Sequence, residues 1–189
     1  MPAAPAQHVG DLVQVAHPRI RVLGAYWHEG WPFARPDTLL RPGAAERLYR
    51  AVAQLPAGFG LAVWDAWRDP RLQRVLHDTV YQDASLAPGF VAPPDPDPDR
   101  CPPHASGGTV DLTLLRCDAD GAGCEPLDMG TGFDFFGPLA NTDSPEASPA
   151  QRANRQLLRE AMEAGGFRNH PMEWWHYGLR SDAPPGPLY

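Results

Sequence analysis

The sequence has no lysine, so arginine supplies all 16 of its cationic side chains, against 23 aspartates and glutamates and a net charge of −7 at pH 7. Nucleic acids and anionic membrane surfaces attract proteins through an excess of positive charge, and a chain this acidic is a poor candidate for either. Long hydrophobic runs are also missing. The longest, 59–64, is far too short to cross a bilayer. We therefore expect no nucleic-acid partner and no membrane association.

Cysteine is scarce as well, with only Cys101, Cys117 and Cys124. An odd number of cysteines argues against a disulfide framework. The N-terminal segment has no basic start, and polar residues interrupt its apolar ones, which is not the pattern of a secretory signal. We expect a cytoplasmic protein. Cys117 and Cys124 flank a short Asp/Gly-rich stretch and could meet across a hairpin, but in a reducing compartment we expect both to be thiols.

What the chain does have is enough apolar residues, 43% of 189, to fill the core of one domain covering 1–189. It is also rich in turn-forming residues, with 18 glycines and 23 prolines, which predicts long, stiff loops. Residues 1–40 read as an irregular segment with clustered aromatics. Residues 84–103 read as a Pro-rich loop. Its aspartates alternate with prolines, which prevent the backbone from wrapping an ion, so we expect a solvated surface loop rather than a cation site.

Hydrophobic periodicity predicts the regular elements. The expected helices cover 42–54, 70–83 and the stretch from Pro149 to Ala164, and the expected strands cover 58–65, 109–116 and 173–179. The third helix has the best-marked ends, because Ser148 and Gln151 can form a capping box and Gly165-Gly166 follows. This order of elements fits an α+β domain in which helices pack on an antiparallel sheet.

One motif that bears chemistry is His104-Ala-Ser-Gly-Gly-Thr-Val-Asp111. Asp111 begins an apolar run that should be buried, and a buried carboxylate needs a partner. On an uninterrupted strand the offset of seven would put His104 and Asp111 on opposite faces, but Gly107 and Gly108 permit a turn that brings both to one point. The alternative is a buried Asp111 that only accepts backbone hydrogen bonds. This motif alone does not decide between them.

A second motif is Glu173-Trp174-Trp175-His176. The tryptophans could form a dry, rigid wall beside two titratable groups. Alternatively, they could be core residues, with Glu173 and His176 there by chance. Taken alone, the second interpretation is the commoner one.

Together the motifs supply His104, Asp111 and His176, which are two nitrogens and one oxygen. Three protein ligands that leave one position for water are typical of a catalytic zinc, so we expect one Zn²⁺ per chain. Glu173, three residues from a ligand and not itself a ligand, then suits a general base. A competing set is Cys101-x-x-His104, which has ligand spacing but lacks a second Cys/His pair.

Four motifs in this order resemble the VanX-type D-alanyl-D-alanine dipeptidases. They are Trp64-Asp-Ala-Trp-Arg68, His104-x-x-Gly-x-x-x-Asp111-Leu-Thr-Leu, Gly130-Thr-Gly-Phe-Asp134-Phe and Glu173-Trp-Trp-His176-Tyr. The resemblance covers about residues 58–180. It implies a zinc peptidase with the fold shared by hedgehog-type and VanY-type domains. Two positions depart from the family pattern, because Pro102 and Thr109 stand where small residues are usual.

The resemblance also implies roles. His104, Asp111 and His176 match the zinc ligands, and Glu173 matches the catalytic base. Arg68 matches an arginine that stabilises the transition state, and Asp134 matches an acid that helps to hold the free amino group of the substrate.

We therefore expect a zinc dipeptidase that acts on free D-Ala-D-Ala or a similar small dipeptide, and so on a cell-wall building block. The alternatives are a related D,D- or L,D-carboxypeptidase that trims longer peptidoglycan peptides, and a zinc-stabilised binding module without turnover.

Overall fold

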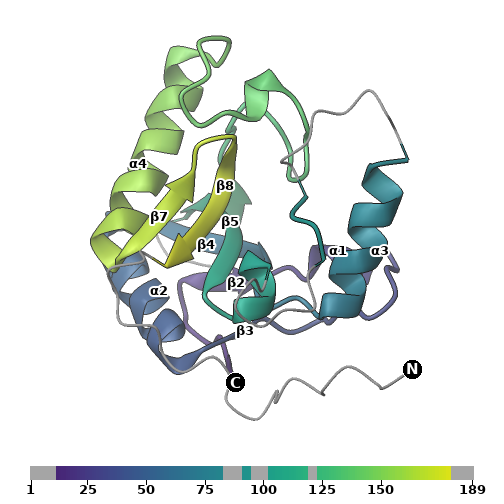
Figure 1. Cartoon of the computed structure of the whole chain (residues 1–189). Coiled ribbons are helices and arrows are strands. Elements are labelled where there is room, and N and C mark those ends of the chain that lie inside the picture. The colour runs from purple at the N-terminus through teal and green to yellow at the C-terminus, as the bar shows by residue number, and fades with distance from the viewer. Residues whose placement is uncertain (1–11, 83–90, 95–101, 119–122, 180–189) are drawn as a thin grey trace, which may run out of the picture.

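The structure is a computed structural model that describes residues 12–82, 91–94, 102–118 and 123–179. In these residues a six-stranded sheet has the strand order β2-β4-β5-β8-β7, with β6 paired to the far end of β5 (Figure 1). A two-stranded sheet, β1 with β3, lies beside it. The strands are β1 (Val13–Gln14), β2 (Ile20–Val22), β3 (Leu39–Leu40), β4 (Phe59–Asp65), β5 (Thr109–Cys117), β6 (Cys124–Pro126), β7 (Phe167–His170) and β8 (Glu173–Leu179), and the helices are α1 (Ala25–His28), α2 (Pro42–Gln54), α3 (Pro70–Val80) and α4 (Pro149–Gly165), with short 3-10 helices η3 (Pro103–Ser106) and η4 (Pro138–Ala140).

The large sheet is mixed, not antiparallel throughout as the sequence suggested. Every pairing between its strands is antiparallel except that of β2 with β4, which is parallel. The reason is the connection between these two strands. The chain leaves β2 and passes through α1, β3 and α2 before it enters β4, and a crossover of this kind returns a strand in the same direction. The broader expectation, an α+β arrangement of helices on a sheet, is confirmed.

Helices α2 and α4 pack against each other and cover one face of the sheet, where the main core lies (Figure 1). The expected bounds of α2 are confirmed, and α4 begins with the expected capping box between Ser148 and Gln151. Side chains of β5 alternate between the two faces of the sheet, as in any strand. Its buried Val110, Leu112 and Leu114 belong to this core. The residues between them, including Asp111, therefore face the other side.

The other side of the sheet faces α3. A second, smaller apolar cluster joins α3 to α1 through Tyr26, Leu72, Leu76 and Val91. Helix α3 ends at Val80, three residues earlier than the sequence pattern suggested, and the two described residues after it form a turn. The polar face of the sheet and α3 thus frame the region in which the chemical motifs meet.

The N-terminal segment is less irregular than expected, since β2 pairs with β4 and α1 follows it directly. Residues 1–11 and most of the Pro-rich loop, 83–90 and 95–101, lie outside the described residues. None of the helices in the described part of the chain combines the length and hydrophobicity that a bilayer crossing needs.

The expectation that Cys117 and Cys124 are thiols is wrong, because the two form a disulfide. They lie directly opposite each other in the antiparallel pairing of β5 with β6. The neighbouring pair carries the backbone hydrogen bond from Asp118 N to Gly123 O. Side chains approach most closely at positions without such a bond, and this register brings the two sulfurs together.

Candidate metal centre

A tight turn brings His104 to Asp111, as the two glycines between them permit. His104 lies in η3, which ends at Gly107 with φ of 70°, a left-handed conformation that glycine adopts without strain. β5 starts two residues later. The Nε2 atom of His104 lies 3.1 Å from Oδ2 of Asp111. Its Nδ1 lies 2.7 Å from the carbonyl oxygen of Ala66 and donates to it, which orients the ring so that Nε2 points at Asp111.

His176 joins this pair from the neighbouring strand. Asp111 on β5 and His176 on β8 are direct partners in the antiparallel register, so their side chains share a face. Nδ1 of His176 lies 2.9 Å from Oδ1 of Asp111 and 3.3 Å from Nε2 of His104. Each residue thus offers one donor atom, all three within 4.8 Å of one another. Cys101, the alternative partner of His104, lies outside the described residues.

An irregularity in β8 places Glu173 beside the same three residues. In a regular strand, residues three apart point to opposite faces. Here β7 and β8 change register between Asn169 and His170, so that β8 bulges over 174–176. Oε2 of Glu173 consequently lies 3.6 Å from Nδ1 of His176.

Asn169 spans this bulge. Its Nδ2 donates to the carbonyl oxygens of both Glu173, at 3.0 Å, and His176, at 3.1 Å. Its Oδ1 accepts a hydrogen bond from the Thr142 hydroxyl at 2.5 Å. One side chain therefore fixes the backbone of both chemically important residues of the last motif.

The surroundings of the site shift the pKa values of two of its carboxyl groups in opposite directions. Burial by itself raises the pKa of Asp111, but the charges and hydrogen bonds of His104 and His176 outweigh burial and hold that pKa well below its ordinary value. Burial, reinforced by the negative charges of Asp111 and Asp134, raises the pKa of Glu173 to about 8. Two carboxyl groups in one site thus differ widely in proton affinity, an arrangement that separates a ligand from a proton acceptor.

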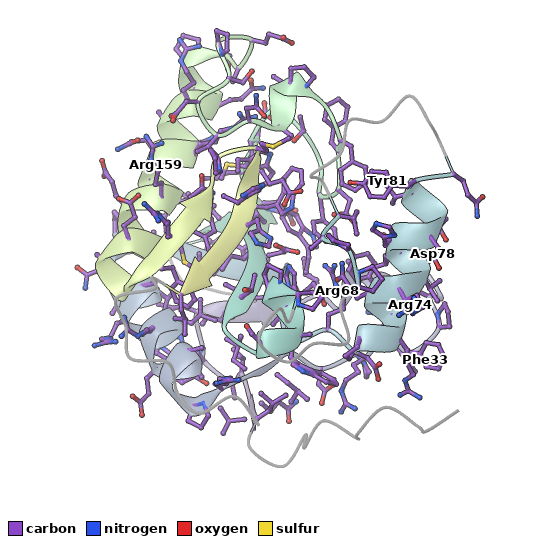
Figure 2. The ribbon with its side chains drawn as sticks, viewed as in Figure 1. Phe33, Arg68, Arg74, Asp78, Tyr81 and Arg159 are labelled. Atoms are coloured by element: carbon purple, nitrogen blue, oxygen red, sulfur yellow. A yellow bond between two sulfur atoms is a disulfide. The ribbon has the colours of Figure 1, made fainter. Side chains whose placement is uncertain are left out.

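Arg68 is buried, at 7% exposure, so a surface role is excluded. Its side chain lies between the sheet and α3, whereas Arg74 and Asp78 lie on the outer side of that helix (Figure 2). Its Nε donates to Asp65 at 2.8 Å, its Nη1 donates to Gln73 at 2.8 Å, and its Nη2 lies 3.6 Å from Oδ2 of Asp111. A guanidinium held in this way is a fixed positive charge at the edge of the group formed by His104, Asp111 and His176, called the donor cluster below.

Asp134 faces the cluster from a different segment, the loop before α4. It adopts a left-handed turn conformation, with φ of 55°. Its carboxylate is also engaged, because the Tyr26 hydroxyl donates to Oδ2 at 2.7 Å. Burial raises the pKa of Asp134 to about 7, although the Tyr26 hydrogen bond works in the opposite direction.

The loop that carries Asp134 is anchored by Arg155 of α4. This arginine is 1% exposed and donates to the carbonyl oxygens of Met129, Leu139 and Asn141, at both ends of the loop. Buried carbonyls need donors. Arg155 thus holds the loop without touching the cluster.

A cavity of about 140 Å³ connects His104, Asp111 and His176 with the other titratable groups of the site. Its polar lining includes the three donor residues with Arg68, Asp134 and Glu173, and its apolar wall comes from Leu76, Val80, Val91 and Phe136. Trp174 and Trp175 do not line the cavity. Both are 1% exposed and belong to the main core, so they support β8 from behind rather than form the wall of the pocket.

Several residues of this site were not singled out in the sequence. Asp65 precedes Arg68 by three residues, a spacing that favours an ion pair but is common in any surface turn. Tyr26 appeared only as one of several clustered aromatics. No local sequence pattern pointed to Gln73, Asn169 or His170. They belong to the site only through contacts with distant parts of the chain.

The arrangement is suited to hydrolysis. Two imidazoles and a carboxylate can hold a divalent ion, a separate carboxyl group with raised pKa lies beside them, and a buried guanidinium lies at the edge. Similar combinations in metal-dependent hydrolases activate water and stabilise developing negative charge.

Comparison with known proteins gives a consistent result. A family model for M15 peptidases, described as D-ala-D-ala dipeptidase, matches residues 33–187. A D-alanyl-D-alanine dipeptidase of Streptomyces coelicolor is 31% identical over 144 residues, which cover 68% of this chain and 66% of that protein. Proteins of the same name from Escherichia coli and Synechocystis are 35% and 28% identical, over 68% and 93% of this chain and 59% and 81% of their own lengths. The chain thus spans just under two thirds of the length of the Streptomyces relative.

Proposed function

The chain belongs to the D-Ala-D-Ala dipeptidase family of M15 peptidases, and we propose that it is a zinc-dependent dipeptidase that hydrolyses free D-Ala-D-Ala or a similar small dipeptide. The observation that carries the proposal is the convergence of three donor atoms with Glu173 directly beside them. The names of the relatives supply the substrate class.

The donor set suits zinc. Two imidazole nitrogens and one carboxylate oxygen, with one position left for water, are a ligand set of catalytic zinc, whereas Ca²⁺ and Mg²⁺ prefer oxygen alone. Ligands at zinc bond lengths on a tetrahedron lie ~3.3 Å apart. His104 Nε2 and His176 Nδ1 lie 3.3 Å apart, and each lies within 3.1 Å of one of the two carboxylate oxygens of Asp111. The hydrogen bond from His104 to Ala66 orients the ring as an outer-shell partner would.

Zinc in such a site polarises the scissile carbonyl and makes the attacking water more acidic. Glu173 is placed to take the proton of that water and to return it to the nitrogen of the leaving amino acid. Its position beside the donor atoms, 3.6 Å from Nδ1 of His176 and outside the proposed ligand set, suits both steps.

Arg68 is placed to stabilise the oxyanion. Its Nη2 lies 3.6 Å from Oδ2 of Asp111, and its other nitrogens are fixed by Asp65 and Gln73, so the charge needs no rearrangement during the reaction. The guanidinium is planar and carries its charge at any working pH.

Asp134 is placed to bind the positively charged amino group of the substrate. Together with a cavity of about 140 Å³, well below the roughly 300–1,000 Å³ of sites for drug-sized ligands, this favours a short peptide with a free amino end. An N-blocked peptide lacks the charge that Asp134 would recognise, and in a longer wall peptide the residue before the scissile bond has no free amino group.

The decisive experiment measures hydrolysis of L,L, L,D and D,D dipeptides, and of N-acetylated D-Ala-D-Ala, before and after chelation and zinc return. We expect cleavage of free dipeptides only, loss on chelation and recovery with zinc. Hydrolysis of the N-acetylated peptide at a similar rate would instead favour a carboxypeptidase.

Glu173→Gln separates an enzyme from a zinc-stabilised binding module. We expect this variant to keep its zinc and to lose about 10²–10⁴-fold in kcat, the range for a positioned base. Glu46→Gln on the exposed side of α2 is the matched control and should keep full activity. Equal kcat in Glu173→Gln and the wild type would refute the base role.

A further inference from the structure

We propose that His170 binds the C-terminal carboxylate of the dipeptide, and that it thereby selects substrates with a free carboxyl end. The inference rests on the proposed dipeptidase function and extends it to a residue with no part in the metal centre. His170 is the last residue of β7 and lines the same cavity as Glu173 and His176. Its ring is nearly perpendicular to that of His176, with the centroids 5.6 Å apart.

The chemistry of the cavity calls for such a residue. A free dipeptide carries a positive amino group and a negative carboxylate. Asp134 can pair with the amino group, but the cavity is also lined by Asp111 and Glu173. A substrate carboxylate among these acids would lose its hydration and meet like charges, which is strongly unfavourable unless a donor is provided.

Most donors that line the cavity are already engaged. Nitrogen and hydroxyl donors with partners at hydrogen-bond distance belong to Arg68, Gln73, Tyr26 and His104. Among the described residues of the lining, the ring of His170 and the outer nitrogen of His176 make no hydrogen bond. The two rings are neighbours, so a carboxylate at this place would meet both, and only His170 lies outside the proposed ligand set. An imidazole offers at least one N–H in either protonation state.

The order of strands in the sheet places His170 where the carboxylate end of a bound dipeptide would lie. Along the sheet, the sequence is β2, β4, β5, β8 and β7. Tyr26, the partner of Asp134, follows β2, whereas Asp111 and His176 are on β5 and β8, and His170 is on β7. Through its hydrogen bond with Tyr26, Asp134 is thus tied to the β2 side of the donor cluster, whereas the ring of His170 lies on the β7 side. A dipeptide whose scissile bond lies at the cluster would extend its two charged ends toward these two residues.

The test compares D-Ala-D-Ala with its C-terminal amide, which has the same shape but no negative charge. Steady-state kcat and KM are measured for both substrates with the zinc-loaded wild type, His170→Ala and His170→Gln. His28→Ala, which changes an exposed histidine of α1, is the matched control. Zinc content is measured for every protein.

We expect His170→Ala to raise KM for the free dipeptide about 10- to 100-fold, as for a lost hydrogen bond to a charged group. kcat should stay within about threefold, because the contact exists in both ground and transition states. KM for the amide should rise much less in His170→Ala, because the amide carbonyl accepts only a weaker, uncharged hydrogen bond from the ring. His170→Gln, which keeps an N–H donor, should recover part of the loss, and His28→Ala should behave as the wild type.

Two results would overturn the inference: an unchanged KM for the free dipeptide in His170→Ala, or an equal rise of KM for the dipeptide and the amide. Either result, obtained with a wild type that cleaves the free dipeptide, removes the role of His170 and leaves the dipeptidase proposal intact. A zinc-loaded wild type that cleaves neither substrate would refute both.

Discussion

Asn169→Asp is the sharpest test of how the site is built, because the change is isosteric and replaces the donating NH2 group by a negatively charged acceptor. Two hydrogen bonds to backbone carbonyls are lost, those to Glu173 and His176. At ~1 kcal/mol net for each bond, the free energy of unfolding should fall by about 2 kcal/mol. In a chain of 189 residues this corresponds to a decrease in Tm of roughly 4–8 °C.

The same change should alter function separately from stability. The negative side chain would repel both carbonyl oxygens and open the bulge of β8. Because displacements on the order of 1 Å can cost about 10²-fold in rate, we expect kcat to fall about 10- to 100-fold and zinc affinity to weaken. Thermal unfolding, kcat with saturating zinc and a competitive zinc titration would measure the three effects.

Asn154→Asp provides the matched control, since Asn154 also donates to one backbone carbonyl, that of Asp128, but lies on α4 away from the cluster. It should lose about half as much stability and keep its kcat. If Asn169→Asp lowered Tm as expected while kcat and zinc affinity stayed at wild-type values, Asn169 would be a purely structural residue and the reasoning would fail.

Three further changes test individual groups. His176→Ala should lose metal and turnover together, measured as zinc content and kcat, because two donors cannot replace three. Arg68→Ala should lower kcat far more than zinc content, and an unchanged rate would remove Arg68 from the mechanism. Asp134→Asn keeps an acceptor for Tyr26 but not the charge, so KM for free dipeptides should rise and the preference over N-acetylated ones should weaken. Asp134 has a pKa of about 7 in the folded chain, and an unfolded aspartate titrates near 4. Between about pH 4 and pH 7, Asp134 is therefore protonated in the folded chain and ionised in the unfolded one. The free energy of unfolding of the wild type falls as pH rises through this range. The Tm of Asp134→Asn should exceed that of the wild type at pH 8, and the difference should shrink toward pH 5. A pH-independent difference would contradict the raised pKa.

The elements that could be predicted are those with strong local signals. α2 has a proline in its first turn and helical apolar spacing, and α4 has a capping box, so both start where the sequence suggested. β2 and β7 are only three and four residues long, too short for a recognisable period. The parallel pairing of β2 with β4 depends on a crossover that no local pattern reveals.

In the site, too, the features with a local sequence signal could be predicted, and those that depend on strand pairing could not. His104, Asp111 and His176 lie together as expected, because residue type and the flexible glycines indicated a common point. The interpretation of the Trp pair as a pocket wall is wrong, since the register change in β8 turns both rings into the core. The disulfide was missed because the odd cysteine count and the expected reducing compartment outweighed the possible hairpin, whose register places the two sulfurs opposite each other.

The donor cluster also has a consequence for the stability of the protein in the cell. His104 and His176 are 72 residues apart, and they meet only once β5 has paired with β8. An ion that binds the assembled chain but not the unfolded one adds about 4 kcal/mol at a thousandfold excess over its dissociation constant. For the proposed metal enzyme, depletion of the ion would therefore lower the stability of the fold and promote proteolysis, so that supply of the ion would influence the abundance of the protein.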